Sequence, residues 1–108
     1  MKIFRIENMK DGWFVGNFNP TAYTADFEVG YKFHKKGEKW DIHYHKVSDE
    51  ITLLVKGKIK IQDTIIKDGD IFVIPSYEIA DPEFLEDSYT VVVKTKSNTK
   101  DKYCLERK

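Results

Sequence analysis

The chain is poor in three features that would by themselves assign it to a class: cysteine, excess charge of one sign and long apolar runs. Its 108 residues contain one cysteine, Cys104, so no internal disulfide can form. Lysine plus arginine number 18, as do aspartate plus glutamate, and this balance argues against binding to nucleic acid or to an anionic membrane. The length supports one domain with one core.

Targeting signals are also missing from the sequence. Residues 1–7 contain no apolar run long enough for a secretory signal peptide. No stretch approaches the roughly 20 apolar residues that a membrane-spanning helix needs. We therefore expect a cytoplasmic protein without a membrane partner.

What the sequence does contain is a series of short stretches typical of β-strands. The clearest alternation, in residues 26–34, places four apolar side chains on one strand face: Phe27, Val29, Tyr31 and Phe33. The other expected strands span residues 12–18, 40–45, 50–55, 59–61, 65–66, 71–74 and 89–95. Many short strands separated by turn signals predict an all-β sandwich or barrel. We expect a single domain over residues 1–108, with a barrel core of about 12–95 and a polar tail, 96–108.

Three local predictions can be compared with the structure. The turn around Gly57 predicts a hairpin between residues 50–55 and 59–61. The continuous apolar run of residues 71–74 predicts a strand that is buried on both faces. The polar residues 97–108 predict a segment that frays or forms a short helix.

The most informative segment contains two of the three histidines. His43 and His45 are separated by one residue, so on a strand they share a face with Asp41, while Tyr44 points away. Glu50 follows five residues later, at the start of the next expected strand. Polar side chains on an alternate face usually meet solvent, but here they can line a barrel interior. Two imidazoles and a carboxylate are the ligands of many open Fe(II) centres, and they also suit Zn, Mn or Ni.

Glycines flank these residues at defined distances. The order is Gly37, five residues, His43, one residue, His45, four residues, Glu50, six residues and Gly57. This spacing resembles the first sequence motif of the cupin family at all of its defined positions. The resemblance covers roughly residues 26–95 and implies an all-β, double-stranded β-helix jelly-roll barrel with a metal ion or a substrate in its interior.

The second cupin motif is only partly present. Gly69 and Pro75 have the separation of that motif, but its next glycine, its histidine and its asparagine are replaced by Tyr77, Ala80 and Phe84. In the cupin family the missing histidine usually completes a metal site of three histidines and one glutamate.

Three outcomes are open at this fourth ligand position. Glu78 or Asp81 could supply a carboxylate, a metal could be held by three ligands with more open positions, or the site could contain no metal. We expect the metal ligands to be His43, His45, Glu50 and Glu78, with Asp81 as the other nearby carboxylate.

The resemblance implies a divalent ion (Fe, Mn, Ni, Co or Zn) and an enzyme that acts on a small polar molecule, of oxygenase, isomerase or lyase type. His43, His45 and Tyr31 are the expected catalytic residues. Without a metal, His43 or His45 could act as the general base, and Tyr31 or Tyr77 as the acid or as a hydrogen-bonding group for a polyol. One alternative is a metal-free sugar or nucleotide-sugar isomerase or epimerase that uses a barrel histidine. Another is a cupin that binds a small molecule without turnover. Cupins commonly dimerise, so a homodimer is also implied.

Overall fold

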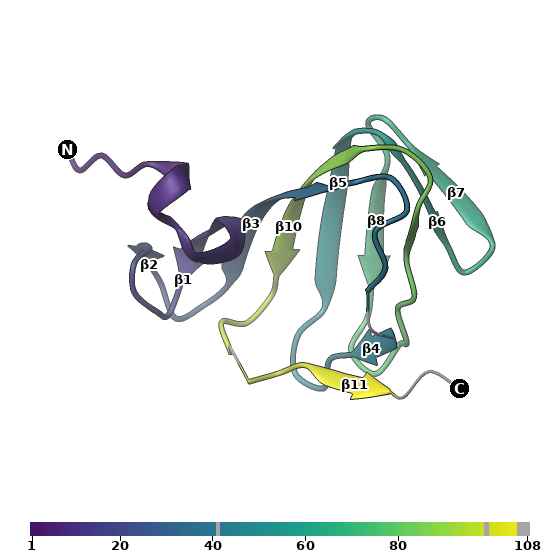
Figure 1. Ribbon diagram of the computed structural model, residues 1–108. Helices are drawn as coiled ribbons and strands as arrows, with labels where there is room; N and C mark the ends of the chain where they lie inside the picture. Colours follow the sequence, from purple (N-terminus) through teal and green to yellow (C-terminus); the bar gives the residue numbers. More distant parts are fainter. Residues whose placement is uncertain (41, 99, 106–108) are drawn as a thin grey trace.

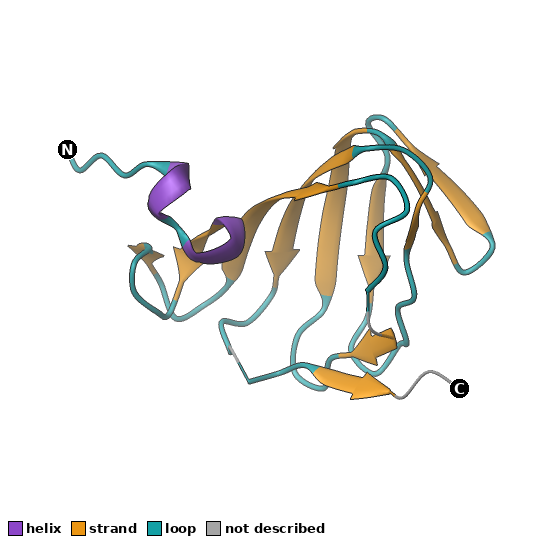
Figure 2. Ribbon diagram, viewed as in Figure 1, coloured by secondary structure: helices purple, strands orange, loops and turns teal. Residues whose placement is uncertain are grey.

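The computed structural model describes residues 1–40, 42–98 and 100–105 and consists almost wholly of β-strands (Figure 1 and Figure 2). Asp41, which the alternation placed beside the histidines, lies outside the described residues. The chain begins with two short 3-10 turns, η1 (Ile6–Asn8) and η2 (Lys10–Gly12). The strands, in chain order, are β1 (Trp13–Gly16), β2 (Ala22–Tyr23), β3 (Glu28–His34), β4 (Ile42–Tyr44), β5 (Glu50–Lys56), β6 (Lys58–Ile61), β7 (Thr64–Lys67), β8 (Ile71–Ile74), β9 (Glu83–Phe84), β10 (Ser88–Lys94) and β11 (Tyr103–Leu105). No described helix is long and apolar enough to span a membrane.

The strands form two layers. The larger layer is a six-stranded sheet in the order β2-β1-β3-β10-β5-β8, which runs from left to right in Figure 1. The smaller layer contains the sheet β7-β6-β9 and the pair β4-β11. Two isolated bridges, Lys39 to Glu83 and His43 to Ala80, join these two parts of the smaller layer. The two layers build the jelly-roll arrangement that the sequence predicts.

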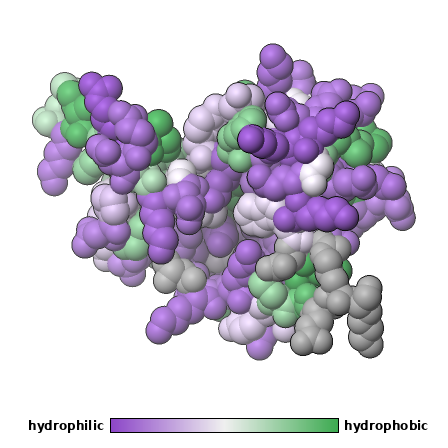
Figure 3. Space-filling view, viewed as in Figure 1, coloured by the Kyte–Doolittle hydropathy of each residue, from purple (hydrophilic) through white to green (hydrophobic). Residues whose placement is uncertain are grey.

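The hydrophobic core lies where β5 and β8 of the large sheet meet β6, β7 and β9. Its buried members are Leu54, Ile59, Ile61, Ile66, Ile74, Ala80 and Phe84. Trp40 and Phe72 pack against them from the side. The remaining surface is largely hydrophilic in the view of Figure 3, apart from patches such as the projecting N-terminal segment, where Ile3, Phe4 and Ile6 are exposed.

The predicted hairpin around Gly57 is wrong. β5 pairs with β10 and β8, whereas β6 pairs with β7 and β9, so Gly57 is the corner at which the chain passes between the layers. Its φ of 129° and the Ser88 Cα atom, 2.7 Å from where a Cβ would lie, leave room for glycine alone. The hairpin forms one strand later, at Gln62 and Asp63, whose φ angles of 50° and 62° match a tight two-residue turn.

The prediction that residues 71–74 are buried on both faces is also wrong. β8 is the edge strand of the large sheet, and Ile71 and Val73 are 67% and 53% exposed. Their side chains point to the outer face of that sheet, which no described part of the chain covers. Tyr31 and Phe33 of β3 are also exposed, and their side chains point to the same outer face. The polar side chains of β3 and β10 that line the cavity, such as Lys32 and Thr90, lie on the inner face beside the apolar core residues of β5 and β8, whereas the outer face is apolar.

The segment after residue 96 is part of the fold. The prediction of a frayed or helical tail is wrong for its described residues, because β11 pairs with β4 and places Cys104 opposite His43. Before β11, the Asp101 carboxylate is buried, with an exposure of 2%. Asp101 accepts hydrogen bonds of 2.8 to 3.1 Å from the backbone N–H groups of Lys46, Val47 and Ser48. Burial raises its pKa, but these hydrogen bonds outweigh burial and hold the pKa below its ordinary value.

We predict that Asp101→Asn lowers the free energy of unfolding by about 3 kcal/mol, because hydrogen bonds to a charged acceptor are lost in a buried place. Urea denaturation followed by tryptophan fluorescence measures this. Asp87→Asn is the matched control, since Asp87 accepts one exposed hydrogen bond, from Lys36 N–H, and should cost under about 1 kcal/mol. Equal losses in the two variants would contradict the anchoring role of Asp101.

Candidate metal centre

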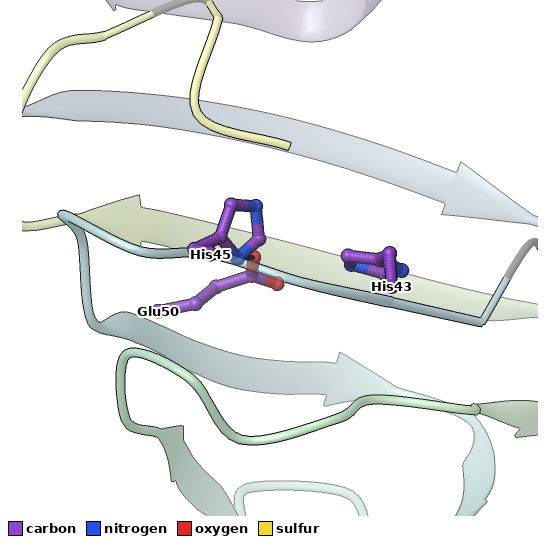
Figure 4. Close-up of side chains that lie close together, drawn as sticks. All are labelled: His43, His45 and Glu50. Carbon is purple, nitrogen blue, oxygen red and sulfur yellow. Dashed lines mark ion pairs between the residues drawn. The ribbon is translucent and has the colours of Figure 1, made fainter. Parts of the chain in front are cut away.

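Three side chains, two from the segment of β4 and one from β5, converge between the layers (Figure 4). His43 lies in β4, His45 lies one residue beyond that strand, and Glu50 is the first residue of β5. One ligand atom from each of the three lies within 4.8 Å of the others. The two imidazole rings are 5.3 Å apart and nearly perpendicular, at 84°. The structure thus brings together three of the four predicted metal ligands.

Backbone hydrogen bonds hold the two histidines in place. His43 N–H donates to the Ala80 carbonyl at 3.2 Å, and Ala80 N–H donates to the His43 carbonyl at 2.8 Å. The carbonyl of His45 accepts a hydrogen bond from Tyr77 N–H at 2.5 Å. Tyr77 has a φ of 69°, so it keeps the left-handed backbone that suits the glycine of the second motif.

Stacked aromatic rings hold the opposite side of β4. Tyr44 stacks with Tyr77 at 6.4 Å and with Tyr103 of β11 at 5.4 Å between ring centroids. Because neighbouring side chains of a strand point to opposite faces, this stack outside β4 orients His43 and His45 towards the interior.

The imidazoles are buried and available as ligands. Burial, with a further contribution from the positive charge of Lys94, lowers the pKa of His45 to about 4. His45 is therefore neutral at physiological pH and does not need to lose a proton before it binds a cation. Its Nδ1 atom lies 3.7 Å from Oε2 of Glu50, too far for a direct hydrogen bond.

These residues fit a divalent ion. Two protein ligands at about 2.1 Å from one ion are at most about 4.2 Å apart. The spacing here is within 4.8 Å, so small side-chain rotations would let all three reach one ion. Two neutral nitrogens and one carboxylate oxygen suit Fe, Mn, Co, Ni or Zn better than they suit Ca or Mg.

Ala80 places a methyl group where the resemblance implies a fourth ligand. Ala80 is paired with His43 across the antiparallel bridge, and residues paired in this way point to the same face. Glu78 lies on the turn before Ala80, its side chain is exposed, and it is not a member of the group formed by the described residues. Asp81 is exposed and borders a second cavity with Lys60 and Glu83. The geometry therefore favours three protein ligands. The role of Glu78 as a metal ligand stays a prediction, because no contact in the structure supports it.

The three ligands line a cavity of about 610 Å³ between the layers. Its apolar wall comes largely from the core side, with Ile59, Ile61, Phe72, Ile74, Phe84 and Val92. Among the described residues, the charged side chains that line it are Asp11, Lys32, Glu38, Glu50, Lys94 and Lys102.

A second polar group in the cavity was not among the predicted site residues. Nδ1 of His34 lies 2.5 Å from Oε2 of Glu38, and Trp40 Nε1–H donates to the same oxygen at 2.7 Å. The His34 ring stacks on Phe84, with 4.3 Å between centroids. Burial raises the pKa of Glu38, but the hydrogen bonds from Trp40 and His34 outweigh burial and lower it. The alternation in residues 26–34 places His34 on the face opposite the apolar side chains. This was the sequence feature that could have indicated that His34 lines the cavity.

Tyr31, the predicted acid, is placed differently. Its backbone borders the entrance of the cavity near Gly12, but its ring is exposed and stacks with Tyr89 at 6.3 Å. Tyr89 also contacts Phe33, with 4.9 Å between centroids, so this aromatic cluster belongs to the outer face of the large sheet. The catalytic role of Tyr31 stays a prediction, and its ring orientation does not favour that role.

Comparison with solved structures identifies the fold. An uncharacterised protein with a double-stranded β-helix domain from Klebsiella pneumoniae matches over 99% of both chains, with a TM-score of 0.69 and 18% identity. KdgF from Halomonas sp. matches over 73% of this chain and 76% of its own, with a TM-score of 0.66 and 23% identity. Oxalate decarboxylase from Bacillus subtilis matches over 75% of this chain and 24% of its own, with a TM-score of 0.65 and 18% identity.

Sequence comparison adds nothing to this result. No protein-family model matches the chain, and no curated protein matches it. The structural likeness confirms the predicted double-stranded β-helix jelly roll, and the chain has the cupin fold.

We predict that Ala80→His adds a fourth ligand and raises the affinity for Zn²⁺ or Co²⁺ by about tenfold or more, equivalent to about 1.4 kcal/mol. Competition with a chromophoric chelator measures the affinity. Ile79→His is the control, because Ile79 is exposed and neighbours Ala80 on the opposite face. An equal gain from both substitutions, or no gain from Ala80→His, would contradict the inferred ligand geometry.

Proposed function

We propose that this cupin-fold protein is a metal-dependent enzyme that acts on a small polar molecule held between its two β-layers. The observation that supports this most is the convergence of His43, His45 and Glu50, all buried or half-buried, on the wall of one cavity. A structural site would be closed by four protein ligands, whereas three ligands beside a methyl group leave room for a substrate.

In this proposal His43, His45 and Glu50 hold the ion. A bound divalent ion would supply Lewis acidity to a substrate oxygen and could lower the pKa of a bound water. The remaining residues would position the substrate and move protons. A carboxylate only accepts hydrogen bonds, so Nδ1–H of His34 donates to Glu38, and Nε2 of a neutral His34 ring would be a proton acceptor.

The type of reaction is left open between oxygenase, isomerase and lyase. Solved structures that share the fold are named as a salicylate 1,2-dioxygenase and as DMSP lyases. One fold supports many reactions, so these names keep the first and third possibilities in view without choosing between them.

A metal-free isomerase or epimerase is the second candidate, and the His34–Glu38 pair favours it. A histidine oriented by a carboxylate is an arrangement suited to general base catalysis without an ion. A cupin that binds a small molecule without turnover is the third candidate, and Ala80 at the position of the second-motif histidine favours it over a standard cupin enzyme. Metal content separates the first two candidates directly.

We predict about one Fe, Mn, Ni, Co or Zn ion per chain in untagged protein purified without chelators. Elemental analysis should find this metal reduced at least tenfold in the double variant His43→Ala/His45→Ala, because two of three ligands are gone. His34→Ala is the control, since His34 lines the cavity without joining the ligand group. A wild-type protein that holds no metal even after reconstitution would favour the metal-free candidate.

We also propose that the protein is a homodimer that buries the outer face of the large sheet. The exposed apolar side chains of this face come from β3, β5, β8 and β10: Tyr31, Phe33, Leu53, Val55, Ile71, Val73 and Tyr89. Monomers rarely expose so many neighbouring apolar groups, and an apolar face of this kind suits twofold association with the same face of a second copy.

We predict that the wild-type chain elutes as a dimer in size-exclusion chromatography with light scattering and that Leu53→Asp shifts it to monomer. A carboxylate in the middle of an apolar interface would be buried without a partner. Ile65→Asp is the matched control, because Ile65 of β7 is 40% exposed and Leu53 is 36% exposed, but Ile65 lies in the other layer. A wild-type monomer, or dissociation by both variants, would contradict the assigned interface.

A further inference from the structure

Three lysines extend into the cavity that holds the candidate metal centre. Lys32 comes from β3, Lys94 from β10 and Lys102 from the segment before β11. The Nζ atoms of Lys32 and Lys94 lie 4.7 and 4.9 Å from the ring centroid of Trp13. The Nζ atom of Lys102 lies 5.0 Å from the centroid of Trp40. Both tryptophans line the cavity, so the three ammonium groups rest on its aromatic walls.

These ammonium groups have unused hydrogen-bonding capacity. Within the part of the chain that the structure describes, none of the three has a carboxylate oxygen within 4.0 Å. Lys32 donates one hydrogen bond, to the backbone carbonyl of Asp11 at 2.5 Å, and an ammonium group has three donors. Burial lowers the pKa of Lys32, Asp11 partly opposes this, and Lys94 and Lys102 lower it again. A bound anion would relieve this cost.

The charges of the cavity point to an anionic ligand once a metal is bound. Among the described residues, the three lysines face three carboxylates: Asp11, Glu38 and Glu50. The apo cavity is therefore close to neutral, whereas a divalent ion leaves two positive charges without a counterpart. Lys32, Lys94 and Lys102 line the same cavity as His43, His45 and Glu50.

A buried hydroxyl beside Lys32 also lacks a partner. Thr90 is 3% exposed and lines the cavity, and its Oγ1 is the one buried side-chain polar atom without a hydrogen bond among the described residues. Thr90 is paired with Lys32 across the β3–β10 ladder, so both side chains point to the same face. Buried polar groups are nearly always satisfied, and an exception at a cavity wall is explained if a ligand supplies the missing acceptor.

The rest of the described cavity lining is largely apolar. Ile59, Ile61 and Phe84 come from the smaller layer, and Phe72, Ile74 and Val92 come from the large sheet; these side chains offer no charge and no hydrogen-bond donor. A ligand that fits both parts of the lining has a compact anionic group at one end and an apolar body.

We propose that Lys32, Lys94 and Thr90 form a carboxylate-binding subsite, with Lys102 at its edge, for a small carboxylic acid that has an apolar body. This inference deepens the proposed function, because it names the substrate class of the same cavity. It concerns residues outside the metal ligand group, so it can be tested on the protein with and without metal.

Benzoate is the probe, and benzamide is its neutral counterpart of the same shape. Ligand-observed NMR should detect benzoate but not benzamide binding to the metal-loaded protein, and weaker binding of benzoate to the apo protein. Lys32→Met and Lys94→Met should each weaken benzoate binding roughly ten- to a hundredfold, as expected for the loss of a charged hydrogen bond. Lys67→Met is the matched control, because Lys67 lies on β7 away from the cavity.

Thr90→Val separates a binding role from a structural one. It removes an unpartnered buried hydroxyl, so thermal stability should stay equal or rise while benzoate binding weakens. A loss of stability with unchanged benzoate affinity would overturn the assignment of Thr90 and show that the hydroxyl is structural.

The outcomes distinguish this inference from the proposed function. Metal uptake without benzoate binding, or equal binding of benzamide, would overturn the carboxylate subsite and leave the metal site intact. Lysine-dependent benzoate binding in a protein that takes up no metal would support the subsite and contradict the proposed metal enzyme. Benzoate binding that the Lys32 and Lys94 variants leave unchanged would also overturn the subsite.

Discussion

One buried carboxylate, that of Asp101, holds the corner on which the site depends. The chain crosses from the smaller layer to the larger one at residues 46–48, where three successive N–H groups point to one place and find no strand to pair with. Two carboxylate oxygens satisfy all three donors at once. His45 and Glu50 stand on either side of this corner, so its geometry sets how their side chains meet. The segment that carries Asp101 then continues into β11, which covers β4.

The large sheet has a mixed inner face, with polar and apolar side chains, and an apolar outer face, and this distribution links the cavity with the proposed assembly. Lys32, Thr90 and Glu50 face the interior, where water or a ligand must satisfy them. Tyr89 and Val73 face outwards, where a second chain would have to cover them. As a monomer, a small domain gains little folding free energy from such an arrangement, because strands such as β8 bury the apolar side chains of only one face. This distribution is consistent with an inner face that binds a ligand and an outer face that associates with a second chain.

The strand segments and the three ligands could be predicted from the sequence because both depend on short-range regularities. Alternation with a period of two places His43 and His45 on one face whatever the fold, and the glycine spacing then identifies the barrel. The pairing of strands was harder to predict. The sequence around Gly57 is typical of a hairpin turn, but Gly57 is the corner at which the chain passes between the layers. The prediction failed because local turn preference does not show which strand β5 pairs with. The apolar run of β8 predicted burial on both faces, but its residues Ile71 and Val73 are exposed on the outer face of the sheet.

The residues around the metal ligands depended on contacts between distant parts of the chain. Nothing in the sequence around Lys94 or Lys102 relates them to His45, and Thr90 is an ordinary strand residue until its lack of a partner is seen in three dimensions. Glu38 becomes significant only when His34 and Trp40 point their nitrogens at it. Sequence by itself determined most of the strand segments, the candidate ligands His43, His45 and Glu50, and the absence of a second-motif histidine, because these are local or periodic features. Tertiary structure alone decided that Ala80 faces His43, that the C-terminal segment pairs with β4 and that the lysines share the cavity, because each requires two segments far apart in the sequence to pack against one another.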